Sequence, residues 1–256
     1  MSITPILAPD EPPPFEVVRP EGRSRTFLLC DHASPRLPRA LGDLGVSEAE
    51  RFTHIGWDIG AAEVARELSR RLDAPLVLSG YSRLAIDCNR PPGVASSIPE
   101  VTCGIPVPGN VALDPEDRSA REEALFWPYH RAAAGLFAAR DAAGVRSVVL
   151  SIHSFTPSLH GKDRPWHVGV LYGRDRRVAD LLLAALAGMG DLVVGDNQPY
   201  WISDNTDYGI PVYGERAGRP SVMIEIRQDL IGTREGAAHW GERLAGVWAS
   251  LEAALP

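Results

Sequence analysis

The sequence predicts an α/β protein, a three-layer α/β/α sandwich in which a mostly parallel or mixed sheet lies between helices. Short apolar runs, typical of buried strands, alternate along the chain with longer segments of helical periodicity. No internal repeat and no strong shift in composition divides the chain. We therefore expect a single domain over residues 23–256, preceded by a proline-rich, extended lead-in over residues 1–22.

The first third of the chain contains apolar runs on both sides of a helical segment. Ser47 followed by Glu50 has the form of a capping box, and apolar residues recur at helical spacing over 59–72. We expect strands over residues 25–33 and 74–82, and a further short strand, stopped by two prolines, within 83–93.

The rest of the chain continues the alternation after a loop rich in Gly and Pro over residues 96–112. Acidic residues follow Asp114, as the first turn of a helix favours. We expect helices over residues 114–144, 174–189 and 233–255. We expect strands over residues 145–155, 166–173, 191–197 and 218–231.

Composition and charge narrow the class of protein. The 256 residues carry a net charge of −7 and include a single lysine, Lys162, with no basic cluster of the kind that binds nucleic acid. Three cysteines without a CxxC pair fit a reducing compartment. Neither a signal peptide nor an apolar run of about 18 residues is visible. We expect a cytoplasmic monomer or small homo-oligomer without nucleic-acid or membrane partners.

Common catalytic motifs are missing from the sequence. It contains no GxGxxG after a strand, no GxxxxGK[ST], no HExxH and no GxSxG. A dinucleotide enzyme, a P-loop ATPase and a serine hydrolase of the usual type are therefore disfavoured.

Two apolar strands each end in a histidine followed by serine. "TFLLCDHASP" places His32 after one apolar run, and "VVLSIHSFTP" places His153 at the end of another. In open α/β sheets ligands bind beyond the carboxyl ends of the strands, so we expect these side chains to lie together. The repeated context favours metal ligation, with two unrelated histidines bonded to the backbone as the alternative.

A catalytic zinc ion usually takes three protein ligands. Asp58, in "HIGWDIGAAEVA", is the candidate for the third, although an aspartate just before a helix is also a common N-cap. Asp31 is adjacent to His32, but alternation along a continuing strand would point it to the opposite face of the sheet.

The segment "SRLAIDCNRPP" concentrates polar groups suited to a carboxylate. Arg83 and Arg90 offer planar guanidinium groups that match a carboxylate, Asn89 adds a neutral donor, and Asp87 could orient one of the arginines. A solvated loop is the alternative interpretation.

Glu225 lies inside an apolar strand, in "SVMIEIRQDL". Burying a carboxylate is costly unless it is paired or catalytic. It could pair with Arg227, or it could be a general base tuned by burial and a nearby metal, with Asp229 as a weaker candidate. The polar, aromatic segment 196–208 is a candidate lid or recognition loop.

These motifs together resemble the N-formylglutamate amidohydrolase family. The segments that carry the resemblance are "CDHAS", "WDIGA", "SRLAIDCNRPP", "SIHSFTP" and "MIEIRQDLI", spread over roughly residues 25 to 235. The family is similar in fold to the zinc carboxypeptidases, which implies a mixed sheet flanked by helices. The carboxypeptidase pattern has an acidic ligand three residues after the first histidine, and here that position is Pro35.

The resemblance implies a role for each candidate residue. His32 and His153 match the two histidine ligands, and Asp58 is our candidate for the acidic ligand. Glu225 matches the catalytic base. The resemblance also implies that Arg83 polarises the scissile carbonyl and that Asn89 and Arg90, beside Asp87, bind the substrate carboxylate.

The resemblance further implies a Zn²⁺-dependent (or other divalent metal-dependent) hydrolase of amino-acid catabolism that converts N-formyl-L-glutamate to L-glutamate and formate. Another N-acyl amino acid or a small peptide is an alternative substrate. A carboxylate-binding protein without catalysis is a second reading. A hydrolase using Ser34 or Ser154 is the weakest, because no nucleophile elbow is present.

Overall fold

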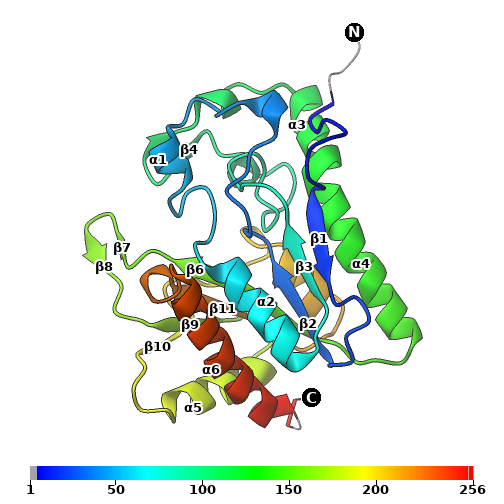
Figure 1. Cartoon of the computed structure of the whole chain (residues 1–256), viewed down its shortest axis with the longest axis vertical. Coiled ribbons are helices and arrows are strands. Elements are labelled where there is room, and N and C mark those ends of the chain that lie inside the picture. The colour runs from blue at the N-terminus through cyan, green and yellow to red at the C-terminus, as the bar shows by residue number, and fades with distance from the viewer. Residues whose placement is uncertain (1–4, 253, 256) are drawn as a thin grey trace.

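A seven-stranded sheet organises the molecule (Figure 1). The computed structural model describes residues 5–252 and 254–255. The strand order is β1-β3-β2-β6-β11-β9-β10. The strands are β1 (Phe15–Val18), β2 (Thr26–Cys30), β3 (Leu76–Ser79), β6 (Val148–Phe155), β9 (Val168–Leu171), β10 (Val194–Asp196) and β11 (Ser221–Arg227).

Most strand pairs in this sheet are parallel. The pairs β2–β3, β2–β6, β6–β11 and β9–β10 are parallel, whereas β1–β3 and β9–β11 are antiparallel. The prediction of a mostly parallel or mixed sheet is therefore confirmed. Because β2, β3, β6 and β11 run in one direction, their carboxyl ends meet at one edge of the sheet.

Helices cover both faces of the sheet. They are α1 (Glu48–Arg51), α2 (Ala61–Leu72), α3 (Pro115–Arg121), α4 (Trp127–Ala142), α5 (Arg177–Ala187) and α6 (Arg234–Glu252). One apolar core joins the sheet to α2, α5 and α6, and a second joins the opposite face to α4. Alternate residues of β2 enter different cores, Leu28 the first and Phe27 the second.

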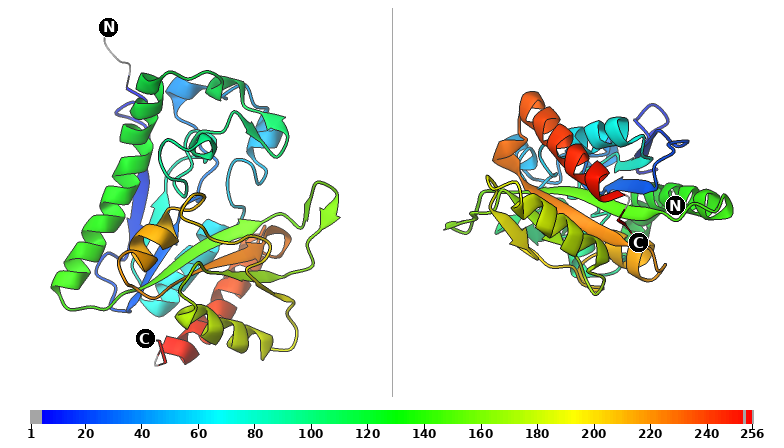
Figure 2. Two further views of the ribbon diagram at one scale, coloured as in Figure 1. Left: turned by 180° about the vertical axis from the view of Figure 1, so that it is seen from behind. Right: turned by 90° about the horizontal axis from the view of Figure 1, so that it is seen from below.

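Shorter elements connect these layers. Residues Glu122–Phe126 form a π-helical turn that links α3 to α4. A second π-helical turn spans Ile210–Glu215, and 3₁₀ turns span Arg39–Leu41, Ala95–Ser97, Pro108–Asn110 and Gln228–Leu230. Two hairpins stand outside the main sheet, namely β4 (Val101–Thr102) with β5 (Ile105–Pro106), and β7 (Ser158–Leu159) with β8 (Lys162–Asp163). The β7–β8 hairpin projects from the body of the molecule (Figure 2).

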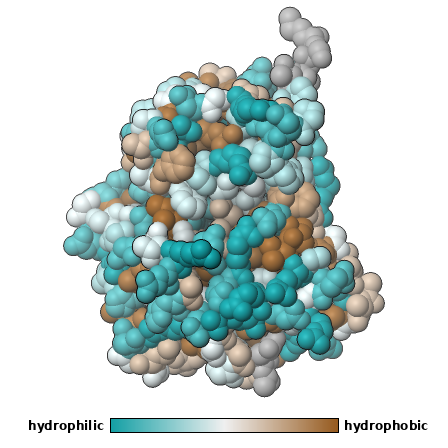
Figure 3. Space-filling view, in the orientation of Figure 1, coloured by the Kyte–Doolittle hydropathy of each residue, from teal (hydrophilic) through white to brown (hydrophobic). Residues whose placement is uncertain are grey.

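The outer face of α2 is polar. Buried residues of this helix, among them Val64 and Leu68, enter the core, whereas Glu63 and Arg70 face solvent. The same face of the molecule is largely hydrophilic over α2 and α6 (Figure 3). None of the helices within the described residues has the length and apolar character needed to cross a bilayer.

The described chain differs from the sequence expectations in two places. The short strand expected within residues 83–93 is wrong: these residues form turns, in which Ala85 N–H donates to Ser82 and Arg90 N–H donates to Asp87. The proline-rich lead-in contributes a strand that the sequence analysis did not identify, because Phe15–Val18 is short and pairs only at the sheet edge. The division of the chain at residue 22 stays a prediction.

Trp248 of α6 anchors the helix to the sheet, and we predict that it is a large stabilising contact. Its side chain is 1% exposed, and its Nε1–H donates to Thr26 Oγ1 over 2.7 Å. Replacing Trp248 by Ala leaves a cavity and an unpaired hydroxyl, so the free energy of unfolding should fall by about 3–5 kcal/mol in urea denaturation. The control Trp201→Ala removes a side chain that is 72% exposed and should change it by less than about 0.5 kcal/mol. Equal effects would contradict the prediction.

Candidate active site

A cavity of about 410 Å³ opens at the carboxyl ends of the parallel strands. The register pairs Glu225 of β11 directly with His153 of β6. His32 follows β2, and the segment containing Arg83 follows β3. The cavity is lined by residues from all of these strand ends, including His32, Asp58, Arg83, Asn89, Arg90, His153 and Glu225. The order of the strands in the sheet thus brings residues that are far apart in the sequence to one cavity.

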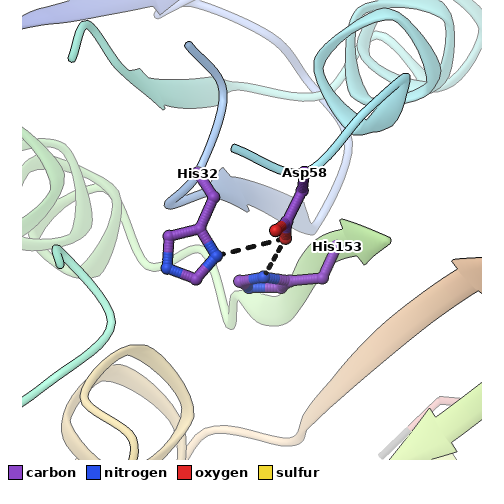
Figure 4. Close-up of side chains that lie close together, drawn as sticks. All are labelled: His32, Asp58 and His153. Carbon is purple, nitrogen blue, oxygen red and sulfur yellow. Dashed lines mark hydrogen bonds and ion pairs between the residues drawn. The ribbon is translucent and has the colours of Figure 1, made fainter. Parts of the chain in front are cut away.

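Asp58 lies between the two histidines (Figure 4). Its Oδ2 atom is 3.1 Å from Nδ1 of His32 and 2.8 Å from Nδ1 of His153. One candidate ligand atom from each of the three residues lies within 4.8 Å of the others, and all three side chains are buried. The structure therefore brings together the three residues predicted to ligate a metal.

Local backbone geometry fixes Asp58 at this position. Its N–H donates to the carbonyl of His32 over 3.0 Å, which ties the segment before α2 to the end of β2. The residue that caps α2 is Gly60, at φ 80°, where a Cβ atom would lie 2.1 Å from the carbonyl oxygen of Ile231. The side chain of Asp58 is consequently free of a capping role, and it also accepts from Ser154 N–H over 3.3 Å.

A carboxylate also contacts the outer nitrogen of each histidine. Nε2 of His32 lies 2.7 Å from Asp87 Oδ1, and Nε2 of His153 lies 3.1 Å from Asp31 Oδ2. Tyr129 donates its hydroxyl to the other oxygen of Asp31 over 2.8 Å. Histidines that ligate metals commonly have an acceptor at their second nitrogen, which fixes the ring orientation.

Sequence reasoning missed Asp31 because it assumed that alternation continues along the strand. The strand β2 ends at Cys30, so the period of two stops before Asp31 and His32. Both side chains can then face the same site. The sequence does place an acidic residue, Asp31, next to the candidate ligand His32. The direction of the Asp31 side chain, however, depends on where β2 ends.

The carboxylates favour positively charged histidines when no metal is bound. Burial lowers the pKa of His153, but hydrogen bonds to Asp31 and Asp58 outweigh it and raise that pKa well above its usual value. Burial and Arg83 lower the pKa of His32, while Asp87 and Asp58 raise it, with a net upward shift. Burial raises the pKa of Asp58, yet the two histidines hold it far below its usual range.

Glu225 has a different environment. The residue is 6% exposed, and its Oε2 atom has no hydrogen-bond partner within residues 5–252 and 254–255. Burial is the main reason why its pKa rises to about 7, and the charge of Asp58 adds to the rise. Arg227, the alternative partner considered from the sequence, instead pairs with Asp229 at 2.8 Å. A carboxyl group with a pKa near neutrality suits proton transfer.

Arg83 and Asp87 form a fixed pair on one wall. Nε and Nη2 of Arg83 donate to Asp87 Oδ2 over 3.0 and 2.7 Å, and Nη1 lies 3.5 Å from Asp58 Oδ1. The two oxygens of Asp87 are thus occupied by Arg83, by His32 and by the N–H of Asn89. This geometry agrees with the expectation that Asp87 orients an arginine.

Asn89 and Arg90 meet the segment 206–209. Asn89 Nδ2 donates to Asp207 over 3.1 Å, and its Oδ1 accepts from Tyr208 N–H and Gly209 N–H. Arg90 donates to the carbonyls of Asn89 and Thr206 and lies 3.7 Å from Asp207. The predicted recognition loop therefore closes one side of the cavity.

Aromatic side chains of the same loop border the cavity. Tyr200 and Trp201 both line it and are 38% and 72% exposed. Two neighbouring aromatic side chains thus present partly exposed apolar surface at the cavity. The lining also includes His54, whose Nε2 atom is buried without a partner among the described residues and whose role the sequence did not suggest.

The sequence and the fold are similar to those of known proteins. The sequence profile of N-formylglutamate amidohydrolase matches residues 24–232. The crystal structure of a gene product of Agrobacterium tumefaciens is 37% identical, has a TM-score of 0.92 and covers 96% of this chain and 99% of its own. That of N-formylglutamate amidohydrolase from Ralstonia eutropha JMP134 is 22% identical, has a TM-score of 0.66 and covers 94% and 98%. No curated protein sequence gives a match.

The buried carboxyl group of Glu225 predicts a pH-dependent effect on stability. Its pKa in the folded protein, about 7, exceeds its usual value of 4.5. The resulting stabilisation is complete below about pH 4.5 and is lost as the pH rises through 7, because ionisation is then less favourable in the folded state. In metal-free protein, Glu225→Gln should therefore gain stability relative to the wild type as the pH rises from about 4.5 to 7.

Urea denaturation at a series of pH values measures this difference. The control variant Glu63→Gln changes an exposed side chain of α2 that does not line the cavity. The prediction would be overturned if the difference for Glu225→Gln changed with pH no more than that for Glu63→Gln.

Proposed function

The chain belongs to the N-formylglutamate amidohydrolase family, and we propose that it is a metal-dependent amidohydrolase that converts N-formyl-L-glutamate to L-glutamate and formate. The observation that carries this proposal is the position of Glu225. A buried carboxyl group, one oxygen of which has no partner among the described residues, lies beside the cluster of His32, Asp58 and His153 in one cavity. A protein that only bound carboxylates would have no use for that combination.

The cluster has the donor chemistry of a zinc site. Two imidazoles and a carboxylate are the ligands that catalytic Zn²⁺ commonly takes, with a further position left for water. Asp31 and Asp87 would orient the histidines from behind. Three buried carboxylates around the histidines, offset by the single guanidinium of Arg83, favour a divalent cation. We propose Zn²⁺, with another divalent ion as the alternative.

Glu225 is proposed to move the proton. A zinc ion, when bound, supplies a more acidic water and polarises the substrate carbonyl. Glu225 in its ionised form accepts a proton from the attacking water as a new C–O bond forms at the formyl carbon. It then gives that proton to the amine nitrogen as the C–N bond breaks, which releases formate and the amino acid.

The arginines are proposed to hold charge on the substrate. Asp87 holds Nε and Nη2 of Arg83, whereas Nη1 makes only a long contact of 3.5 Å to Asp58 Oδ1, so Nη1 would donate to the carbonyl oxygen as negative charge develops there. Arg90 would bind the α-carboxylate. Because the side chain of Asn89 is occupied by residues 207–209, we assign it to positioning Arg90, and Asp87 to positioning Arg83.

A serine nucleophile finds no support in the geometry. The hydroxyl of Ser154 donates to the carbonyl of Ile59 over 2.9 Å. Ser34 accepts from Arg36 N–H and lines a separate cavity. Other N-acyl amino acids or a small peptide stay as alternative substrates, and the expected cytoplasmic location, small assembly and lack of nucleic-acid or membrane partners stay part of the proposal.

Formate release from N-formyl-L-glutamate tests the activity directly. We expect release that disappears after chelation and returns when Zn²⁺ is added. Glu225→Gln should lower kcat by about 10²- to 10⁴-fold while the protein keeps its fold and binds Zn²⁺. No release by folded protein under any of these conditions would refute the formylglutamate assignment.

Asp31 provides a test of the metal site that does not depend on turnover. Asp31→Asn keeps the shape of the side chain but removes the charge behind His153, so Zn²⁺ affinity should fall about 10- to 100-fold. Competition with a chromophoric chelator measures the affinity. Asp229→Asn, at a half-exposed position paired with Arg227, is the matched control and should leave affinity unchanged. An unchanged affinity for Asp31→Asn would argue against the ligand assignment.

A further inference from the structure

We propose that Arg164 anchors a carboxylate on the side chain of the substrate, and that it thereby selects acidic N-formyl amino acids. This inference rests on the proposed function, since it concerns the same cavity. It adds a subsite beside Tyr200 of the cavity lining, which neither the motifs nor the family match assigns. The ligand class is an N-acyl amino acid whose side chain ends in a carboxylate.

Arg164 is held in place by its surroundings. It follows the β7–β8 hairpin, and its N–H donates to the carbonyl of Pro157 over 2.8 Å. Its Nη1 donates to the hydroxyl of Tyr200 over 2.8 Å, and its guanidinium lies 4.8 Å from the centre of the Tyr200 ring. It also lies 5.9 Å from the ring of Phe155. A guanidinium stacked in this way is oriented before a ligand arrives.

The guanidinium of Arg164 lacks an acidic partner within the described part of the chain. The two arginines that line the cavity are already paired, Arg83 with Asp87 at 2.7 Å and Arg90 with Asp207 at 3.7 Å. Arg164 contacts the rings of Tyr200 and Phe155, which both line the cavity. An oriented guanidinium with donors to spare is suited to bind a carboxylate through two hydrogen bonds.

The position of Arg164 relative to the reacting groups supports this assignment. Burial raises the pKa of Tyr200, the charge of Glu225 adds to the rise, and Arg164 and Arg83 oppose it. Tyr200, whose hydroxyl accepts from Arg164 Nη1 over 2.8 Å, lines the same cavity as Glu225 and Arg83. A substrate whose amide lies at Glu225 can extend its side chain toward Tyr200 and Arg164.

Charge complementarity completes the argument. N-formyl-L-glutamate carries two carboxylates, and Arg90 is assigned to the first. Asp58, Asp207 and Glu225 also line the cavity, so a second carboxylate without a cation would be repelled. Arg164 contacts Tyr200 and Phe155 of the lining and has no acidic partner among the described residues, whereas Arg83 is held by Asp87.

The test compares two substrates of the same shape in the zinc-loaded protein. N-formyl-L-glutamate and N-formyl-L-glutamine differ in the side-chain charge, and kcat/KM is measured for each. Arg164→Met should lower kcat/KM for the glutamate substrate about 10- to 100-fold, mainly through KM, and leave the glutamine substrate within about 2-fold. Arg164→Lys should restore part of the preference.

If Arg164 only held the 196–208 loop in place through Tyr200, the two substrates would respond to Arg164→Met in the same way. Loss of loop order would lower kcat/KM for both substrates equally, and that result, or no loss for either, would overturn the proposal. Arg131→Met, which removes an exposed arginine of α4 outside the cavity lining, is the matched control. Hydrolysis of neither substrate by the wild type would refute the proposed function instead, so the two failures are distinguishable.

Discussion

One oxygen atom, Oδ2 of Asp58, determines how three segments of the chain must meet. It accepts from the imidazoles of His32 and His153 and from the backbone of Ser154. Because β2 and β6 are neighbouring parallel strands, the two histidines reach the same edge of the sheet, and the segment that enters α2 delivers Asp58 between them. The position of the site therefore depends directly on the order of the strands in the sheet.

The same arrangement places unusual charge inside the protein. Asp31, Asp58 and Asp87 are almost completely buried, and each is compensated by a histidine or an arginine. Protons on the imidazoles can supply this compensation, and binding of the proposed divalent ion would release them. The Oε2 atom of Glu225 has no hydrogen-bond partner in the described part of the chain, so burial of this carboxyl group costs stability.

Local sequence patterns were sufficient for the layers and for most of the cluster around His32, Asp58 and His153. Apolar runs marked β2, β6 and β11, and the histidines at two strand ends followed from them. What the patterns could not supply was the residue at which a strand stops, which placed Asp31 in the site. They also could not show that Asn89 bonds to residues more than 100 positions away. The turns of 83–93 combine local hydrogen bonds with bonds that the pattern does not reveal, from Asn110 to the carbonyl of Leu84 and from Arg121 to that of Ala85.

The residues proposed for catalysis and those proposed to contact the substrate side chain lie on different parts of the fold. The groups proposed for chemistry lie on or beside the paired strands, whereas Tyr200, Trp201 and Arg164 belong to loops that follow a small hairpin or cross the sheet edge. Loops accept substitutions and changes of length more readily than paired strands do. The fold can therefore acquire a new substrate by changing its outer loops while the reaction itself is inherited unchanged, which makes it a scaffold on which related hydrolases can diverge.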